Sequence, residues 1–291
     1  MMKVLVTGGN GQFAKSMRAS SGFQDLEIDY VSRTDLDITN VGNWERVLTE
    51  CLPEVVINAA AYTDVEAAED HAEAAFAVNN DGAALGALAC MRANIKFIHL
   101  STDYVFNGHE SEPLDELTLA DPLNTYGDSK WAGEKAVLDV NPKALVIRIS
   151  WLYSPFGKNF YTMMLNLFRT MENVNVVNDQ IASPTNAIVF AENLLSILPQ
   201  MTKDSSLHGI VHYAEEGQAS WYDFAQEIHK LCAAKCTLSA VDSSFFKTKA
   251  ERPKYSKLNN EKFKSATGIN PIAWQAALEK CYRMTDKRTL N

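Results

Sequence analysis

Short runs of aliphatic and β-branched residues alternate, in the first half of the chain, with longer segments whose apolar residues recur every three or four positions. The short runs predict strands near residues 3–8, 27–32, 54–60, 96–101 and 144–150, and the longer segments predict helices near 11–20, 43–51, 73–94 and 126–140. A strand–helix repeat pairs its strands in parallel through right-handed crossovers. The pattern therefore predicts an α/β fold with a doubly wound parallel sheet, the Rossmann arrangement.

The rhythm becomes less regular after about residue 150. Helices are predicted near 159–171 and 187–198, and a polar, lysine-rich stretch covers 245–264. We expect a main domain over residues 1–150 and a smaller C-terminal lobe over 151–291, interleaved because part of 174–200 is expected to return to the main sheet. A ligand is expected between them, at the carboxyl ends of the strands.

Composition excludes several classes of partner. The chain has 36 acidic and 27 basic residues and a net charge of −9, without a basic run, which disfavours nucleic acid. No stretch approaches the roughly 18 apolar residues of a membrane helix, and no export signal is evident at the start. Five scattered cysteines indicate reduced thiols in a cytoplasmic protein. The apolar positions of the predicted helices are compatible with a homodimer and are equally explained by the core of a monomer.

The first motif with chemistry is VTGGNGQFA, at the junction of the first predicted strand and helix. Glycines there permit a tight turn and close approach of a pyrophosphate to the backbone, while the helix N-terminus favours an anion. The small Ala14 allows strand and helix to pack closely. The motif predicts a dinucleotide-binding main domain, with cofactor contacts at Gly8, Gly11, Gln12 and Phe13.

Three further segments are expected to border the dinucleotide. Arg33 follows the second predicted strand, where it can pair with a 2′-phosphate, so NADPH is favoured and NADH is the alternative. Asp37 and Ile38 are expected beside the adenine. The third predicted strand ends in small residues that leave room for a flat cofactor, although tight core packing explains them equally well: Ala59, Ala60 and Ala61.

Tyr126 and Lys130 form the only Y-x-x-x-K in the chain, and the spacing places both on one helical face. The pair opens the helix after the fourth strand, whose end carries the hydroxyl-rich HLSTDY. A nearby ammonium lowers the pKa of a phenol, which can then give a proton to an oxygen that gains charge as hydride arrives. Thr102 is placed to hydrogen bond that oxygen. We therefore predict Thr102, Tyr126 and Lys130 as catalytic residues.

These motifs, taken in order, resemble the extended short-chain dehydrogenase/reductase family and, within it, the dTDP-4-dehydrorhamnose reductases. The resemblance covers nearly the whole chain. It rests on TGGNGQ, INAAAYTDVEAAE, HLSTDYVFNG, PLNTYGDSKWAGE, RISWLY with GKNF, DQIASPT, ASWYDFA and RPKYSKL.

The resemblance implies hydride transfer from a nicotinamide to the C4 keto group of a nucleotide-linked 4-keto-6-deoxy sugar, dTDP-4-dehydrorhamnose becoming dTDP-rhamnose. It implies that Lys130 binds the nicotinamide ribose, and that the smaller lobe binds substrate. The implied substrate contacts are Asp103, Tyr104, Trp151, Asn159 and Arg252. Some relatives bind magnesium through a glutamate after the glycine turn, where this chain has Lys15 and Ser16, so no metal is predicted.

Two other functions share this fold. Sugar-nucleotide epimerases and dehydratases keep the tyrosine and the lysine. The dehydratases, however, resemble STDEVYG after the fourth strand, and this chain has Tyr104 in STDYVF where they have the glutamate that acts as an acid. A non-catalytic NADP-binding regulatory subunit is the second alternative. The presence of Thr102, Tyr126 and Lys130 together favours an enzyme over this non-catalytic subunit.

Overall fold

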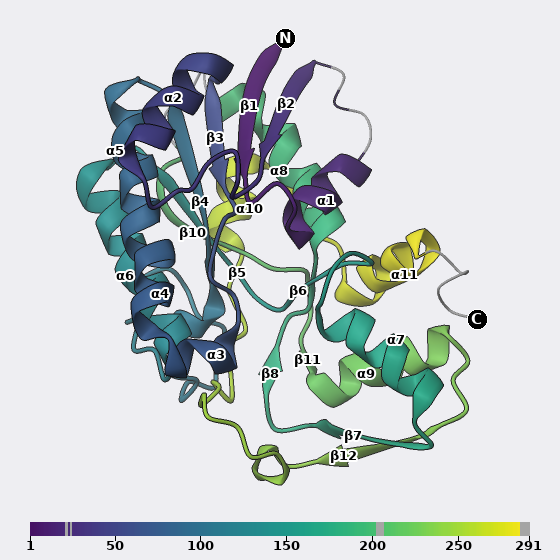
Figure 1. The fold of residues 1–291 in the computed structure, drawn as a ribbon. Helices are drawn as coiled ribbons and strands as arrows, with labels where there is room; N and C mark the ends of the chain where they lie inside the picture. The colour runs from purple at the N-terminus through teal and green to yellow at the C-terminus, as the bar shows by residue number, and fades with distance from the viewer. Residues whose placement is uncertain (21–22, 24, 202–206, 286–291) are drawn as a thin grey trace.

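Six parallel strands form the central sheet of the computed structural model, in the order β10-β5-β4-β3-β1-β2 (Figure 1). The structure describes residues 1–285 apart from 21–22, 24 and 202–206. The strands are β1 (Met2–Thr7), β2 (Leu26–Val31), β3 (Val55–Asn58), β4 (Lys96–Thr102), β5 (Leu145–Ile149) and β10 (Gly209–Tyr213). This order confirms the doubly wound α/β fold predicted from the sequence.

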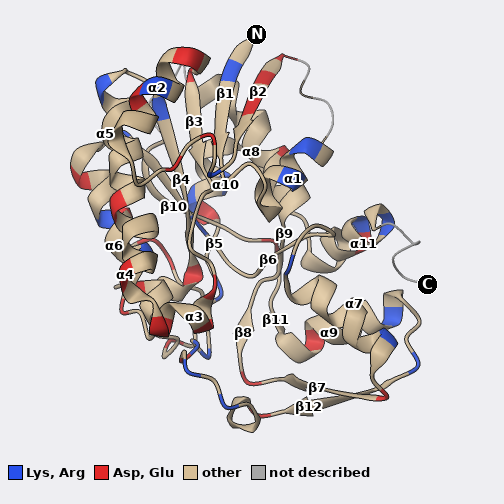
Figure 2. Cartoon of the chain, viewed as in Figure 1, with Lys and Arg blue, Asp and Glu red and all other residues tan. Residues whose placement is uncertain are grey.

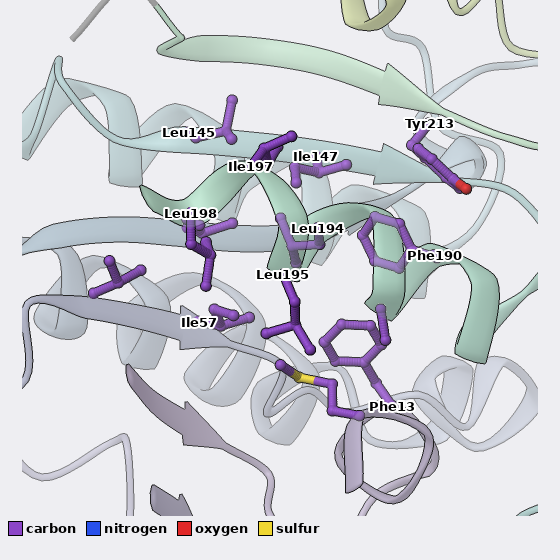
Figure 3. Close-up of a cluster of buried hydrophobic side chains, with 14 of the residues drawn as sticks. Phe13, Ile57, Leu145, Ile147, Phe190, Leu194, Leu195, Ile197, Leu198 and Tyr213 are labelled. Carbon is purple, nitrogen blue, oxygen red and sulfur yellow. The ribbon is translucent and has the colours of Figure 1, made fainter. Parts of the chain in front are cut away.

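Side chains that alternate along the strands divide the core into two layers, one on each face of the sheet. Val4 and Val6 pack with α1 (Gln12–Ala19) and α8 (Ala187–Met201). Leu5, between them, packs on the other face with α2 (Val41–Cys51), α5 (Ala83–Arg92) and α6 (Thr125–Val140). Figure 3 shows the first layer, in which Phe13 and Phe190 lie with their ring centroids 5.2 Å apart. The layers hold the strands so that their carboxyl ends meet at one edge.

The helix predicted over residues 73–94 has a wider turn in its middle. It consists of α4 (Ala72–Phe76), the π-helix η1 (Ala77–Gly82) and α5. π-helical turns are rare and are frequent at functional sites. The backbone of η1 lies against α6, where a Cβ on Gly133 would be 2.0 Å from the carbonyl oxygen of Asn79. Only a residue without a side chain fits at this contact.

A second lobe has its own apolar core. Its helices are α7 (Phe160–Thr170), α9 (Trp221–Leu231) and α11 (Trp274–Met284). Its strand pairs are β7 (Asn173–Val177) with β12 (Thr237–Val241), β8 (Ile181–Ala182) with β11 (Ala219–Ser220), and β6 (Leu152–Tyr153) with β9 (Thr185–Asn186).

The chain passes between the two parts several times (Figure 1). After β9 it returns to the main sheet as α8 and β10, and after β12 it returns again as α10 (Glu261–Thr267), which packs Phe263 against Tyr213. Among 174–200, α8 therefore lies on the main sheet, whereas β7 stays in the second lobe. No helix in the described part of the chain is long and apolar enough to cross a membrane.

The contact between α6 and η1 generates a stability prediction. We expect Gly133→Ala to lower the free energy of unfolding by about 1–3 kcal/mol, because the new Cβ meets backbone that can move only with its whole helix. Chemical denaturation followed by circular dichroism measures the change. In the control Gly42→Ala, the Cβ lies at an ordinary 3.4 Å from Asn40, and the stability should stay equal or rise by up to about 1 kcal/mol. Equal stabilities for the two variants would contradict the packing argument.

Candidate active site

A crevice of about 890 Å³ opens where the carboxyl ends of β1, β3 and β4 meet the start of α6. It is lined by every predicted catalytic and cofactor residue and by four of the predicted substrate residues: Gly8, Gly11, Gln12, Phe13, Arg33, Asp37, Ile38, Ala59, Ala60, Ala61, Thr102, Asp103, Tyr104, Tyr126, Lys130, Trp151 and Asn159. Arg252 instead lines a neighbouring cavity of about 1900 Å³ in the second lobe. The two spaces adjoin each other, because they share the lining residues Thr63, Val65, Lys158, Asn159, Phe160 and Trp221.

The glycine turn between β1 and α1 provides a cradle for a pyrophosphate. Gly8 has a φ of +67°, and a Cβ there would lie 3.0 Å from the backbone of Ala59 and Ala60. The Gly11 amide donates to the Gly8 carbonyl at 2.7 Å, which closes the turn directly before α1. Backbone free of side chains and the N-terminus of a helix are what an anionic diphosphate requires. The residues at this end of the crevice fit a dinucleotide.

The segment after β2 forms the adjoining wall. The Trp44 indole donates to the Ile38 carbonyl at 2.9 Å and fixes this segment against α2. Asp37 accepts hydrogen bonds from the Thr39 amide and hydroxyl, which hold the pKa of its carboxyl below the ordinary value. Arg33 is exposed at the rim, so its guanidinium is available to a phosphate that enters the crevice.

Tyr126 begins α6 next to the end of β4. The Asn124 side chain accepts from the Gly127 amide at 2.8 Å and so caps the helix at this point. The Tyr126 ring meets Tyr104 edge-on with centroids 5.9 Å apart, and its hydroxyl is hydrogen-bonded with Thr102. This arrangement places a phenol and a hydroxyl side by side at the floor of the crevice.

The pKa of Tyr126 departs from the expectation. Burial raises it to about 12, and the hydrogen bond with Thr102 offsets only part of that effect. The predicted lowering by Lys130 is not found: Lys130 is not among the groups that shift the pKa of Tyr126. The Lys130 ammonium instead donates to the Leu100 carbonyl at 2.7 Å and lies 3.2 Å from Nε2 of His99. Burial lowers the pKa of Lys130 to about 8, although Glu134 acts in the opposite direction.

A buried ion pair stands behind Lys130. The Arg148 guanidinium on β5 donates to both carboxylate oxygens of Glu134, with Nη2 2.7 Å from Oε2, and the two side chains are 3% and 2% exposed. Ser101 on β4 also donates to Glu134. Charges this deeply buried are tolerated only when their hydrogen bonds are satisfied. The pair therefore holds the third turn of α6 on the sheet.

Asp103 and Trp151 join the main sheet to the second lobe. The Ser256 hydroxyl donates to Asp103 at 2.5 Å, and burial raises the pKa of Asp103 to about 7. Trp151 follows β5 with a φ of +44°, a conformation that costs a bulky residue free energy. Its indole stacks on Trp221 of α9, with centroids 3.4 Å apart and planes 5° apart. This stack helps hold Trp151 in the strained conformation.

Arg252 belongs to the lysine- and arginine-rich segment 247–254, which pairs with the acidic side chains of α3 (Val65–Asp70); Figure 2 shows α3 carrying acidic residues. Its guanidinium donates to Glu66 at 2.6 Å, and Lys249 pairs with Asp70. The Tyr104 hydroxyl is also hydrogen-bonded with Arg252. Arg252 thus reaches from the second cavity to the edge of the crevice.

Several residues of the site were given no role from the sequence. Trp221 and His99 lie within motifs that carried the resemblance, but nothing in their spacing indicates a stacking partner or a contact with Lys130. Glu134 and Arg148 are buried charges on a helix and a strand that the sequence alone presents as ordinary solvated positions. The only usable signal was a charged residue within an apolar strand, Arg148 in LVIRIS.

Metal ligands do not gather in the described part of the chain: no group of three or more histidine, cysteine, aspartate or glutamate side chains is arranged to hold an ion. His212 lies on β10 and contacts the Leu114 carbonyl at 3.0 Å and Arg148 at 3.4 Å. Burial lowers its pKa to about 3, so its imidazole is neutral at ordinary pH.

Comparison with known proteins gives consistent matches over the whole chain. The protein-family model named RmlD substrate binding domain matches residues 2–286 of this chain. A dTDP-4-dehydrorhamnose reductase of Aggregatibacter actinomycetemcomitans is 36% identical over 96% of this chain and 98% of its own. The solved dTDP-4-dehydrorhamnose reductase of Clostridium acetobutylicum superposes with a TM-score of 0.91 at 34% identity. That of Bacillus anthracis, in complex with NADP, superposes with a TM-score of 0.90 at 33% identity. Each match covers 97% of this chain and 99% of the other.

The ion pair behind Lys130 generates a second stability prediction. Glu134→Gln leaves the Arg148 guanidinium buried without a compensating charge, and we expect a loss of about 3–5 kcal/mol in the free energy of unfolding, measured in urea. Glu50→Gln removes an exposed i,i+4 pair with Arg46 and should cost less than about 1 kcal/mol. A loss of that small size in Glu134→Gln would show that the buried pair does not stabilise α6.

Proposed function

The chain belongs to the family of the RmlD substrate binding domain, and we propose that it is an NAD(P)H-dependent reductase of a nucleotide-linked 4-keto-6-deoxy sugar, converting dTDP-4-dehydrorhamnose to dTDP-rhamnose. Relatives that carry the name dTDP-4-dehydrorhamnose reductase support the substrate. The observation that carries the proposal is the convergence of Thr102, Tyr126 and Lys130 with the glycine turn in one crevice.

Each residue of the crevice has a separate role in the proposed reaction. A bound reduced nicotinamide dinucleotide supplies the hydride that the C4 carbonyl carbon accepts. Tyr126 gives its proton to the carbonyl oxygen, and Thr102 donates a hydrogen bond to that oxygen as its charge grows. Lys130 is proposed to bind the ribose of the cofactor. Because burial holds the pKa of Tyr126 at about 12, the phenol is protonated and ready to donate at neutral pH.

The cofactor is proposed to lie along the wall from Gly8 to Ala61, with NADPH preferred over NADH. Arg33 is exposed beside Asp37 and can pair with a 2′-phosphate. The relative from Bacillus anthracis is in complex with NADP. The sugar nucleotide is proposed to extend past Asp103, Tyr104 and Trp151 into the second cavity, towards Asn159 and Arg252.

We also propose that the protein works in the cytoplasm on a small-molecule substrate without a nucleic-acid partner. All five cysteines are free thiols, as a reducing compartment would keep them: Cys51, Cys90, Cys232, Cys236 and Cys281. The net charge of −9 opposes binding to a phosphate backbone.

The reaction is tested by mixing the protein with NADPH and dTDP-4-dehydrorhamnose and following the absorbance of the reduced cofactor. We expect stoichiometric, substrate-dependent oxidation, and Tyr126→Phe should lower kcat about 10²–10⁴-fold while NADPH binding is kept, because only the proton donor is lost. Tyr282→Phe on α11 is the matched control and should keep full activity. Unimpaired turnover in Tyr126→Phe would refute its role, and sugar isomerisation without net cofactor oxidation would indicate an epimerase.

Cofactor preference is tested with Arg33→Ala. Loss of the guanidinium should raise the KM for NADPH about tenfold and leave the KM for NADH nearly unchanged, because only NADPH carries the 2′-phosphate. Arg92→Ala on α5, outside the crevice, is the control. An equal change for both cofactors would show that Arg33 does not recognise the 2′-phosphate.

A further inference from the structure

A row of buried polar side chains runs behind the crevice, from Lys130 to the glycine turn. His99 on β4 lies 3.2 Å from Nζ of Lys130 through Nε2, and 3.1 Å from the Asn58 amide on β3 through Nδ1. Asn58 in turn lies 2.6 Å from the hydroxyl of Thr7, the residue before Gly8. The four polar side chains are each at most 2% exposed. The row therefore joins the predicted catalytic lysine to the cofactor turn through protein alone.

The contacts of the Lys130 ammonium determine where it can reach. An ammonium has three N–H donors and no acceptor. One donor binds the Leu100 carbonyl at 2.7 Å, and a second is directed to His99. We propose that His99 is a positioning residue for Lys130: its neutral imidazole accepts one N–H through Nε2 and holds the ammonium so that the third N–H remains for the ligand in the crevice. This inference rests on the proposed function of Lys130.

The protonation of His99 follows from its surroundings. Burial and the neighbouring Lys130 charge both hold the pKa of His99 well below its ordinary value, so the ring is neutral. When Nε2 accepts from the ammonium, the ring proton is on Nδ1, and the Asn58 amide must be turned over relative to the structure so that its oxygen receives that proton. In the amide orientation that the structure has, Thr7 donates to the Asn58 oxygen and the Asn58 nitrogen donates to Nδ1. The ring proton then lies on Nε2 and can be given only to an uncharged Lys130 amine.

The two arrangements do not stabilise Lys130 equally. A hydrogen bond to an ionised group is roughly twice as strong as one between neutral groups. The ammonium therefore gains more from His99 as an acceptor than the amine gains from His99 as a donor. His99 is expected to favour the charged form of Lys130 and to oppose the effect of burial.

Few other charges act on this ammonium from the elements packed against α6. Glu134 on α6 raises the pKa of Lys130 but is itself bound by Arg148 of β5. Asp103, in η2 (Asp103–Val105), is bound by Ser256 and Thr102. The other ionisable groups of these elements are engaged or exposed: Glu66 with Arg252, Glu69 with the Thr125 amide, Asp70 with Lys249, Lys96 with the Lys143 and Leu207 carbonyls, Tyr104 with Arg252, and Glu73, Asp81 and Arg92 at the surface.

The ionisation of Lys130 can be measured directly. In protein labelled with carbon-13 at the lysine Cε, the Lys130 signal is the one missing from Lys130→Arg, and its pH titration gives the pKa without any substrate. We expect His99→Leu to lower the pKa of Lys130 by about one unit relative to the wild type, a tenfold change in the ratio of ammonium to amine. In His99→Gln the amide can still accept from the ammonium, so the pKa of Lys130 should fall by no more than about a third of that amount.

Two further variants make the result interpretable. His99→Met fills the same space with a flexible apolar side chain, and it replaces His99→Leu if near-UV circular dichroism shows that the leucine variant is unfolded. His229→Gln changes a partly buried imidazole of α9 that contacts the Cys236 carbonyl, and it should leave the Lys130 titration unchanged. An unchanged or raised pKa in the folded apolar variant would overturn the proposal, as would a His99→Gln titration equal to that of His99→Leu.

Turnover supplies an independent measurement. The high-pH limb of kcat should move about one unit lower in His99→Leu and remain near its wild-type position in His99→Gln, whereas a purely structural loss would lower kcat equally at all pH values. A wild-type protein without reductase activity would refute the proposed function while the titration still decides the role of His99. If the wild type is active but the pKa of Lys130 is the same in the wild type and in the His99 variants, this inference alone is refuted.

Discussion

Burial of the Lys130 ammonium is the constraint on which the site depends. A cation that is 2% exposed is stable only when its donors are satisfied and an opposite charge lies near. The protein meets this requirement with the end of β4, which offers the Leu100 carbonyl and the His99 ring, and with the Glu134 carboxylate one turn along α6. Glu134 in turn requires Arg148 from β5. Three neighbouring elements are thereby fixed around one side chain.

The sheet explains why residues distant in sequence meet here. In a parallel sheet the carboxyl ends of all strands lie along one edge, so the segments after β1, β2, β3 and β4 converge without any special contact between them. The sequence could predict this convergence because it depends only on the alternation of strands and helices. For the same reason the sequence alone predicts that the glycine turn, Thr102 and the pair Tyr126 and Lys130 lie close together, and in the structure they line one crevice. All of them lie at strand ends or helix starts.

What the sequence could not predict depends on side-chain direction and on contacts across the second lobe. The π-helix η1 packs its backbone closely against Gly133, and no local periodicity in the sequence predicts it. The high pKa of Tyr126 follows from burial, which a four-residue spacing does not reveal. Trp221 and Ser256 reach the site from segments more than 80 residues beyond α6, through tertiary contacts that local pattern does not encode.

The two stacked indoles have a consequence for how motion in this protein could be observed. Trp151 belongs to the chain leaving the main sheet and Trp221 to the first turn of α9, and their parallel planes are in van der Waals contact. The strong transitions of two indoles held so close couple electronically, which gives a paired band of opposite signs in circular dichroism. A movement that separates the lobe from the sheet would weaken that band. The stacked indoles therefore report on the relative position of the second lobe and the main sheet at the crevice.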